Sequence, residues 1–94
     1  MTKHYNVIDN SALNRFEIHE EGHIAYEKYE RFEGGIAYVS TFVPEALGGR
    51  GIASFLVKYV LDDAIAKGLK IKPVCPVVKG YIEKHPEYQQ YVVE

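Results

Sequence analysis

The 94-residue chain is 47% hydrophobic and 26% charged, which fits one small globular domain spanning residues 1–94 and excludes a disordered or collagen-like chain. Eleven lysines and arginines against thirteen aspartates and glutamates give a net charge of −2, which argues against a general nucleic-acid-binding protein. The single cysteine excludes an internal disulfide framework and a multi-cysteine zinc site, and we expect no metal. No apolar run is long enough for a membrane helix and no signal peptide is visible, so we expect a cytoplasmic protein.

Alternating apolar and polar residues in the first half predict an antiparallel meander of four strands. These strands are expected at residues 5–8, 15–19, 23–30 and 36–43. The turns between them are expected at Asp9–Ser11, Glu21–Gly22 and Glu33–Gly35. In the second strand, Phe16 and Ile18 share one face, while Glu17 and His19 point the other way.

The second half of the chain predicts a crossover between parallel strands. A glycine-rich loop, a long helix, a strand and a second helix opened by Pro76 are expected at residues 45–51, 52–67, 69–74 and 77–85. A strand–helix–strand passage implies a right-handed connection to a parallel neighbour, and the strand at 36–43 is apolar enough to lie inside the sheet. The predicted fold class is therefore α+β: a mixed, mostly antiparallel sheet with a β-α-β crossover and two main helices.

The loop Gly48–Gly51 before the long helix has the features of an anion site. The first N–H groups of a helix have no partner within it, and the helix dipole places partial positive charge there. Glycines carry no Cβ that would keep a bulky anion away from these N–H groups, and Arg50 adds a charge suited to forked phosphate contacts. A connection that needs glycine only for its turns explains the loop equally well.

Two common phosphate-binding motifs do not match this loop. A P-loop needs a Lys-Ser/Thr pair after its last glycine, but Ile52 and Ala53 follow Gly51. A dinucleotide-binding fingerprint would have its third glycine at Ser54, and it needs an acidic residue about 20 positions further on, where the chain has lysines.

A third pattern, the acyl-coenzyme A loop, matches better. Residues 43–53 resemble motif A of the GNAT acetyltransferase superfamily, which reads Gln/Arg-x-x-Gly-x-Gly/Ala between a β-bulged strand and a helix. Gly51–Ala53 match the second half of the motif, while Gly48 stands where Gln or Arg is usual. The resemblance implies acetyl-coenzyme A (acetyl-CoA) as the cofactor.

Two further segments make the chain similar to a small, truncated GNAT-like family over roughly residues 15 to 88. These segments are Thr41–Pro44, at the end of one strand, and Pro73–Cys75, on the next strand. Ser40 departs from the family, since many members have a histidine at that position, and the role of that imidazole cannot be carried over to this chain.

The resemblance implies a defined cofactor site. The loop that begins at Gly48 would bind the pyrophosphate through the backbone amides of Gly49, Arg50, Gly51, Ile52 and Ala53. The main chain of Thr41 and Val43 would pair with the pantetheine amides, as an added β-strand does. The thioester would lie in a gap where the strands at 36–43 and 69–74 splay apart.

Acetyl transfer to an amine requires a neutral amine, a hydrogen-bond donor for the oxyanion and an acid for the leaving thiolate. The main-chain N–H near Val43 is the candidate oxyanion donor. In GNAT enzymes a tyrosine on the helix after the splayed strand often protonates the thiolate. Ile82 occupies that position here, so the candidate is Tyr81, which is rotated from it by about 100° on a helix.

Cys75, at the end of a strand expected to border the cofactor, is the second catalytic candidate. The helix opened by Pro76 would place positive dipole near its thiol, so Cys75 could be an acyl-accepting nucleophile or a contact for the thioester. A buried cysteine that only fills space is the alternative. Glu27, Glu30 and Glu33 are equal candidates for the general base.

The sequence thus predicts an acetyl-CoA-dependent N-acetyltransferase whose acceptor is an amine carried by a small molecule or a protein. A coenzyme A-binding sensor or adaptor without turnover is the alternative, and a purely structural domain is a third hypothesis. Binding of acetyl-CoA separates the third hypothesis from the others. Release of free coenzyme A in the presence of amines separates the first from the second.

Overall fold

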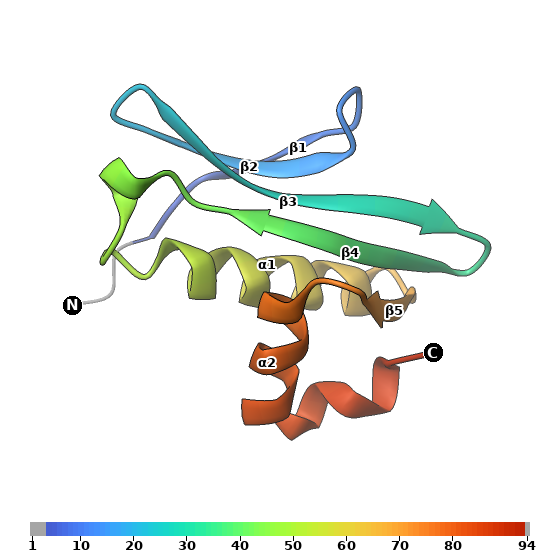
Figure 1. Cartoon of the computed structure of the whole chain (residues 1–94). Coiled ribbons are helices and arrows are strands. Elements are labelled where there is room, and N and C mark those ends of the chain that lie inside the picture. Colours follow the sequence, from blue (N-terminus) through green and yellow to red (C-terminus); the bar gives the residue numbers. More distant parts are fainter. Residues whose placement is uncertain (1–3, 94) are drawn as a thin grey trace.

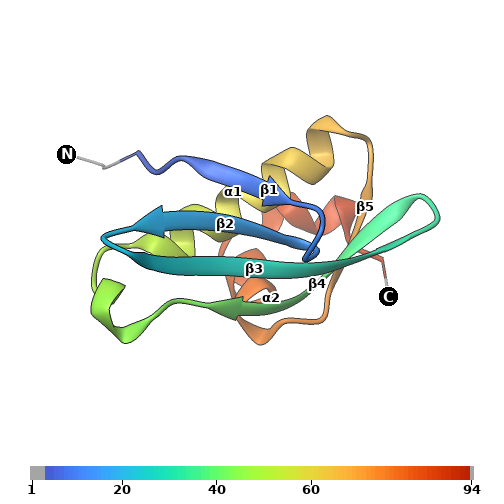
Figure 2. The ribbon, with the colours of Figure 1, turned by 90° about the horizontal axis from the view of Figure 1, so that it is seen from above.

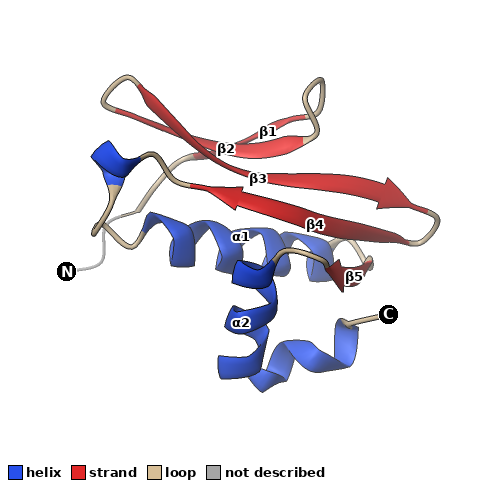
Figure 3. Ribbon diagram, in the orientation of Figure 1, coloured by secondary structure: helices blue, strands red, loops and turns tan. Residues whose placement is uncertain are grey.

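Residues 4–93 are described by a computed structural model, in which a five-stranded sheet lies against two α-helices and two short 3-10 helices (Figure 1). The strands are β1 (Val7–Asn10), β2 (Arg15–Glu20), β3 (His23–Phe32), β4 (Gly35–Phe42) and β5 (Lys70–Pro73). The helices are η1 (Glu45–Leu47), α1 (Ile52–Ala66), α2 (Pro76–Lys84) and η2 (Pro86–Tyr91). Apart from β5, the strands therefore precede the helices along the chain (Figure 3).

The sheet has the order β1-β2-β3-β4-β5, so strands that follow one another in sequence are neighbours in space. The first four strands form an antiparallel meander, and β5 pairs in parallel with β4 after the chain has crossed over through α1. The strand β4 therefore lies inside the sheet, as its apolar sequence predicts. The predicted α+β fold, with a mixed, mostly antiparallel sheet, a β-α-β crossover and two main helices, is confirmed.

Both main helices cover the same face of the sheet. Helix α1 runs along this face, while α2 and η2 lie beside it below β5 (Figure 1, Figure 2). The buried residues of α1 are all apolar, and they are Ile52, Leu56, Val57, Val60, Leu61 and Ala64. Tyr38 of β4 ties the two layers together, because its buried hydroxyl donates a hydrogen bond to the Val60 carbonyl at 2.5 Å. No helix within residues 4–93 has the length and apolar character that crossing a membrane requires.

The first strand differs from the prediction, because β1 begins at Val7 and includes Asp9 and Asn10, which the sequence indicated as a turn. Asp9 lies opposite Phe16, and its carboxylate accepts a hydrogen bond from the Tyr29 hydroxyl at 2.7 Å. These cross-strand interactions outweigh the preference of Asp and Asn for turns. The turn follows at residues 11–14 instead.

The other predicted turns are confirmed. The β2–β3 hairpin turns through Glu21 and Gly22, whose φ values of 50° and 78° are those of a two-residue type I′ turn. The β3–β4 hairpin turns at Gly34, with a φ of 79°. After α2 the chain packs back on the body, because Tyr88 in η2 is buried and Val92 forms a bridge to β5.

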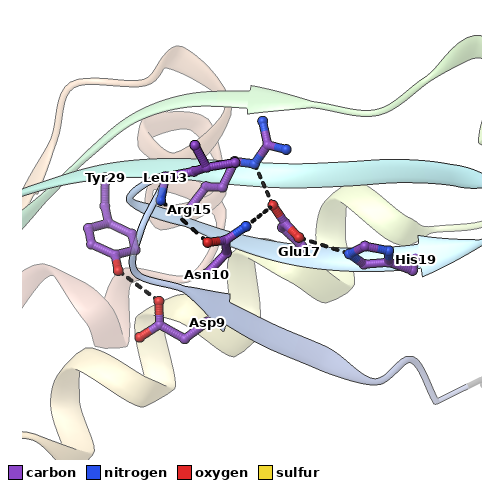
Figure 4. A network of polar contacts seen from close by, with 7 residues as sticks. All are labelled: Asp9, Asn10, Leu13, Arg15, Glu17, His19 and Tyr29. Carbon is purple, nitrogen blue, oxygen red and sulfur yellow. Dashed lines mark hydrogen bonds and ion pairs between the residues drawn. The ribbon is translucent and has the colours of Figure 1, made fainter.

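Glu17 of β2 points away from the core as predicted, but it is only 3% exposed. The side chains of Asn10, Arg15 and His19 surround its carboxylate (Figure 4). Asn10 donates to Oε2 at 3.0 Å, Arg15 donates to the same oxygen at 2.5 Å, and His19 Nε2 lies 2.8 Å from Oε1. Burial raises the pKa of Glu17, but the hydrogen bonds from Arg15, His19 and Asn10 outweigh burial and hold the pKa below its ordinary value.

We expect Glu17→Gln to lower the melting temperature at neutral pH by roughly 5 °C, the shift that about 1 kcal/mol produces in a domain of this size. Because the folded-state pKa of Glu17 lies below the ordinary value of 4.5, this stabilisation is fully present above pH 4.5 and is lost as the pH falls through the folded-state pKa. The difference in melting temperature, measured by circular dichroism, should therefore close in strongly acidic buffer. Glu30→Gln, at an exposed position of β3, is the matched control. A difference that does not change with pH would contradict this account of Glu17.

Candidate functional site

The glycine loop between β4 and α1 is held at both ends by buried side chains. Leu47 in η1 and Ile52 at the start of α1 are each 1% exposed, whereas residues 48–51 between them lie at the surface. Gly49 and Gly51 have φ values of 77° and 73°, in the left-handed region that favours glycine. A Cβ built on either glycine would meet no atom within 4 Å, so open space lies in front of both.

The backbone N–H groups of this loop have the features of an anion-binding site. Within residues 4–93, the N–H groups of residues 49–53 donate no hydrogen bond, and α1 has no acidic residue in its first turn. The Tyr5 hydroxyl donates to the Arg50 carbonyl at 3.1 Å. Since the N–H and C=O of a trans peptide point in opposite directions, this bond turns the N–H of Gly51 away from Tyr5. Several unpaired N–H groups at the start of a helix form a site for phosphate.

Two of the predicted cofactor-binding residues are engaged within the protein. The N–H of Gly48 donates to the Glu45 carbonyl at 3.0 Å, so it is not among the unpaired amides. The Arg50 guanidinium forms an ion pair with Glu21 of the β2–β3 hairpin, and the hydrogen bond and charge of Glu21 raise the pKa of Arg50. A phosphate on the loop would therefore compete with Glu21 for this cation.

Next to the loop, the second half of β4 is not paired with β5. The two strands pair only as far as Tyr38, whose carbonyl then accepts a hydrogen bond from the Cys75 N–H at 2.8 Å. The β3–β4 register shifts at this point and leaves Val39 as an extra residue, a β-bulge. Beyond the bulge, β4 still pairs with β3 on one side. On the other side, Thr41 and the following Val43 pair with no described residue, and this is the edge that is predicted to pair with pantetheine.

A pocket of about 390 Å³ opens between α1 and α2, beside the first turn of α1. Ala53 and Ser54 line it from α1, and Val77, Gly80 and Lys84 line it from α2. It provides room beside the loop for the rest of a phosphate-bearing ligand. A larger pocket of about 640 Å³ lies between β5, α2 and η2, but its lining includes none of the residues 49–53 whose N–H groups are unpaired, whereas Ala53 lines the smaller pocket. We therefore assign the candidate site to the smaller pocket.

Where β4 and β5 separate, three side chains from different elements meet and form what we call the acid–thiol cluster: Glu27, Thr41 and Cys75. The Thr41 hydroxyl donates a hydrogen bond to Oε1 of Glu27 on β3, and Thr41 Oγ1 lies 3.1 Å from Sγ of Cys75, the N-cap residue of α2. Glu27 and Cys75 are 0% and 2% exposed. The second carboxylate oxygen of Glu27, Oε2, is buried without a hydrogen-bond partner among the described residues. The cluster thus places a buried acid and a buried thiol on the two sides of one hydroxyl.

The burial of Glu27 determines its protonation. Burial raises the pKa of the Glu27 carboxyl to about 8, and the hydrogen bond with Thr41 offsets only part of this shift. At neutral pH the side chain therefore carries a proton for most of the time, unlike an ordinary glutamate with a pKa of about 4.3. Glu30 and Glu33 are exposed, so burial distinguishes Glu27 among the three glutamates that the sequence left equal.

Tyr81 lies apart from the acid–thiol cluster. It lines the pocket between α1 and α2, and its ring stacks on His85 with 4.1 Å between the ring centroids. Burial raises the pKa of Tyr81, and the charged side chains that act on its phenol are Lys58, Asp62 and Glu87. None of these charges belongs to the cluster. The structure does not bring Tyr81 together with Cys75, and its role as the thiol acid stays a prediction.

The sequence analysis did not find two residues of this site. Tyr5, which orients the loop, is 45 residues away from Arg50 in the sequence, so nothing near either residue indicates the contact. Lys84, in the last turn of α2, adds a positive charge to the pocket next to the negative charge of Glu83. Its position beside the first turn of α1 follows only from the way in which the two helices pack.

Comparison with known proteins identifies the class. Residues 15–91 match the family model of the GCN5-related N-acetyltransferases, so the chain belongs to this family. The chain is similar to the protein NATD1 of Gallus gallus and of Mus musculus, with 39% identity over 46 residues in both cases. The human NATD1 protein shows the same 39% identity. The aligned segment covers 49% of this chain but only 41–42% of the NATD1 proteins, so the chain spans about two fifths of the relatives it matches.

Proposed function

We propose that the protein is an acetyl-CoA-dependent N-acyltransferase that transfers an acetyl group to an amine. The observation that supports this most strongly is the order of features along β4 from its C-terminal end. The unpaired N–H groups of residues 49–53 come first, the unpaired edge at Thr41 of β4 and the following Val43 comes next, and the Cys75 thiol comes last. A ligand with phosphates at one end and a thioester at the other would meet these features in the same order. The single free thiol of the chain fits the reducing cytoplasm.

Each part of the site has a role when acetyl-CoA is bound. The N–H groups of residues 49–53 would bind the pyrophosphate, and each hydrogen bond to a charged group contributes about 1.5–3 kcal/mol. The edge of β4 at Thr41 and Val43 would pair with the pantetheine amides. Thr41 and Cys75 would border the thioester, and the N–H near Val43 is the candidate donor to the oxyanion.

The acceptor that we propose is an amine carried by a small molecule or a protein. The amine must be neutral when it attacks the thioester. Ser40 and Phe42 alternate with Thr41 along β4, so they lie on the face of the sheet opposite the acid–thiol cluster. This face is open, since Ser40 is exposed and Phe42 is 47% exposed. A bulky acceptor such as a protein-borne amine would therefore have room beside this part of the sheet.

A coenzyme A-binding sensor or adaptor without turnover is the second candidate. It is favoured by the separation of Tyr81 from the acid–thiol cluster and by Ser40, which offers no titratable group at the edge of β4. Both candidates need the same loop. Only turnover distinguishes them.

Two measurements test the proposal. Calorimetric titration measures the binding of acetyl-CoA. Chromatography then detects free coenzyme A released in the presence of a panel of amines and lysine-containing peptides. Binding together with amine-dependent release of coenzyme A supports the transferase. Binding without release, across the whole panel, favours the sensor. Absence of binding at millimolar acetyl-CoA would overturn both candidates.

We expect Glu21→Gln to strengthen acetyl-CoA binding by roughly two- to fivefold, because the carboxylate then no longer competes with phosphate for Arg50. The effect is small because an exposed ion pair is weak, and the Glu21 side chain is 60% exposed. Calorimetry at low salt measures it. Glu33→Gln removes the same charge from the other hairpin and should bind like the wild type. Equal affinity of all three proteins would show that Arg50 does not reach the ligand.

A further inference from the structure

The acid–thiol cluster contains a continuous hydrogen-bonded path between a buried acid and a buried thiol. Thr41 Oγ1 contacts both Glu27 Oε1 and Cys75 Sγ, but a hydroxyl has one hydrogen to donate. While Glu27 is ionised, Thr41 donates to Glu27 and the thiol donates to Thr41. Once Glu27 carries a proton, Glu27 donates to Thr41 and Thr41 donates to sulfur. The direction of the whole path thus depends on where one proton lies.

We propose that Glu27 accepts the proton of the Cys75 thiol through Thr41. The proton of the S–H group moves to Thr41 Oγ1 while the hydroxyl proton of Thr41 moves to Glu27 Oε1. The products are a Cys75 thiolate, a neutral Glu27 carboxylic acid and an unchanged hydroxyl, so negative charge moves from carboxylate to sulfur and the total charge is conserved. Glu27 acts through Thr41 and is therefore a positioning residue rather than a group that touches a ligand.

The surroundings of Glu27 support this role. On the same face, β2 presents the apolar Phe16 and Ile18, and the buried side chains of α1 are all apolar. From β4, the titratable neighbour is Tyr38, whose own pKa is raised by burial. A buried carboxylate without a cation, and with Oε2 unpartnered, is costly to keep in a fold. This cost indicates a chemical role for the Glu27 side chain, because an apolar side chain would fill the same space without the cost.

The basicity of Glu27 suits it to accept a proton. Burial raises the pKa of Glu27 to about 8, so its carboxylate binds a proton far more strongly than an ordinary glutamate does. At the other end of the path, Cys75 is the N-cap residue of α2, so its thiol lies close to the positive end of the helix dipole. That the thiolate would accept an acetyl group rests on the proposed function, whereas the proton transfer itself does not.

The rate at which iodoacetamide modifies Cys75 without acetyl-CoA tests the path, because the chain has one cysteine and mass spectrometry counts its modification directly. At about pH 7.5 we expect Glu27→Gln and Thr41→Val to react roughly tenfold more slowly than the wild type, less than the roughly 10²–10⁴-fold that a fully ionised positioned base supplies, because Glu27 is ionised in only a minority of molecules at this pH. Thr41→Ser keeps the hydroxyl and should restore the rate, and Glu30→Gln is the control for lost charge. Near pH 10 the four variants should converge with the wild type, since the thiolate then forms without a base.

Two outcomes would overturn the proposal. By charge alone, removing a carboxylate near a thiol favours the thiolate, so equal or faster modification of Glu27→Gln at about pH 7.5 excludes a proton-accepting role. A loss of reactivity that is the same at every pH, with unchanged circular dichroism, would assign Glu27 a structural role only. Because no cofactor is present, this experiment succeeds or fails independently of acetyl-CoA binding.

Discussion

Gly51→Ala is expected to weaken acetyl-CoA binding about 100-fold. Gly51 is the N-cap residue of α1 with a φ of 73°, and the space that a Cβ would enter is empty of protein atoms. The methyl group would occupy space that we assign to the phosphates, and alanine would favour a backbone outside the left-handed region. Losing two hydrogen bonds to a charged group, at about 1.5 kcal/mol each, corresponds to roughly this factor.

Gly34→Ala provides a matched control for this substitution. Gly34 has a φ of 79° and likewise has no atom within 4 Å of a built Cβ, but it lies in the β3–β4 hairpin at the other end of the sheet (Figure 1). Both variants should lose similar stability, about 1–2 kcal/mol from backbone strain. Calorimetry should show a loss of binding for Gly51→Ala alone. If both variants bind acetyl-CoA like the wild type, the loop does not hold the phosphates.

Much of the fold could be predicted from the sequence because its signals are local. Strand alternation, the Glu21–Gly22 hairpin and the apolar surface of α1 each lie within a short segment. The prediction was wrong at the end of β1, because Asp9 is held by Tyr29, 20 residues away. The burial of Glu17 was missed for the same reason, since side chains from two strands cover it.

The candidate site likewise has one part that the local sequence predicts and one part that depends on the fold. The glycine loop is contiguous and requires glycine at positive φ, so its sequence alone suggested an anion site. The acid–thiol cluster draws one residue each from β3, β4 and the start of α2, and only the strand register places Glu27 opposite Thr41. Without knowledge of that register, the sequence leaves Glu27, Glu30 and Glu33 as equal candidates for the general base. The protonation of Glu27 likewise depends on burial, which is a property of the packed fold.

Cys75→Ala is expected to lower the turnover of acetyl-CoA with an amine by roughly 100-fold or more while changing the affinity for acetyl-CoA by less than about threefold. The thiol lies within the acid–thiol cluster at the proposed position of the thioester, whereas we expect the binding energy to come mainly from the N–H groups of residues 49–53. Alanine is small and apolar, so the buried position should tolerate it with a modest loss of stability.

Tyr81→Phe tests the competing assignment. Because the phenol of Tyr81 has its charged neighbours at Lys58, Asp62 and Glu87 rather than in the acid–thiol cluster, we expect turnover to fall by no more than about threefold. Chromatographic measurement of coenzyme A release, with the amine that gives the fastest rate for the wild type, compares the two variants directly. If Tyr81→Phe loses turnover while Cys75→Ala retains it, the group that serves the leaving thiolate is the phenol on α2. The acid–thiol cluster would then act outside acetyl transfer.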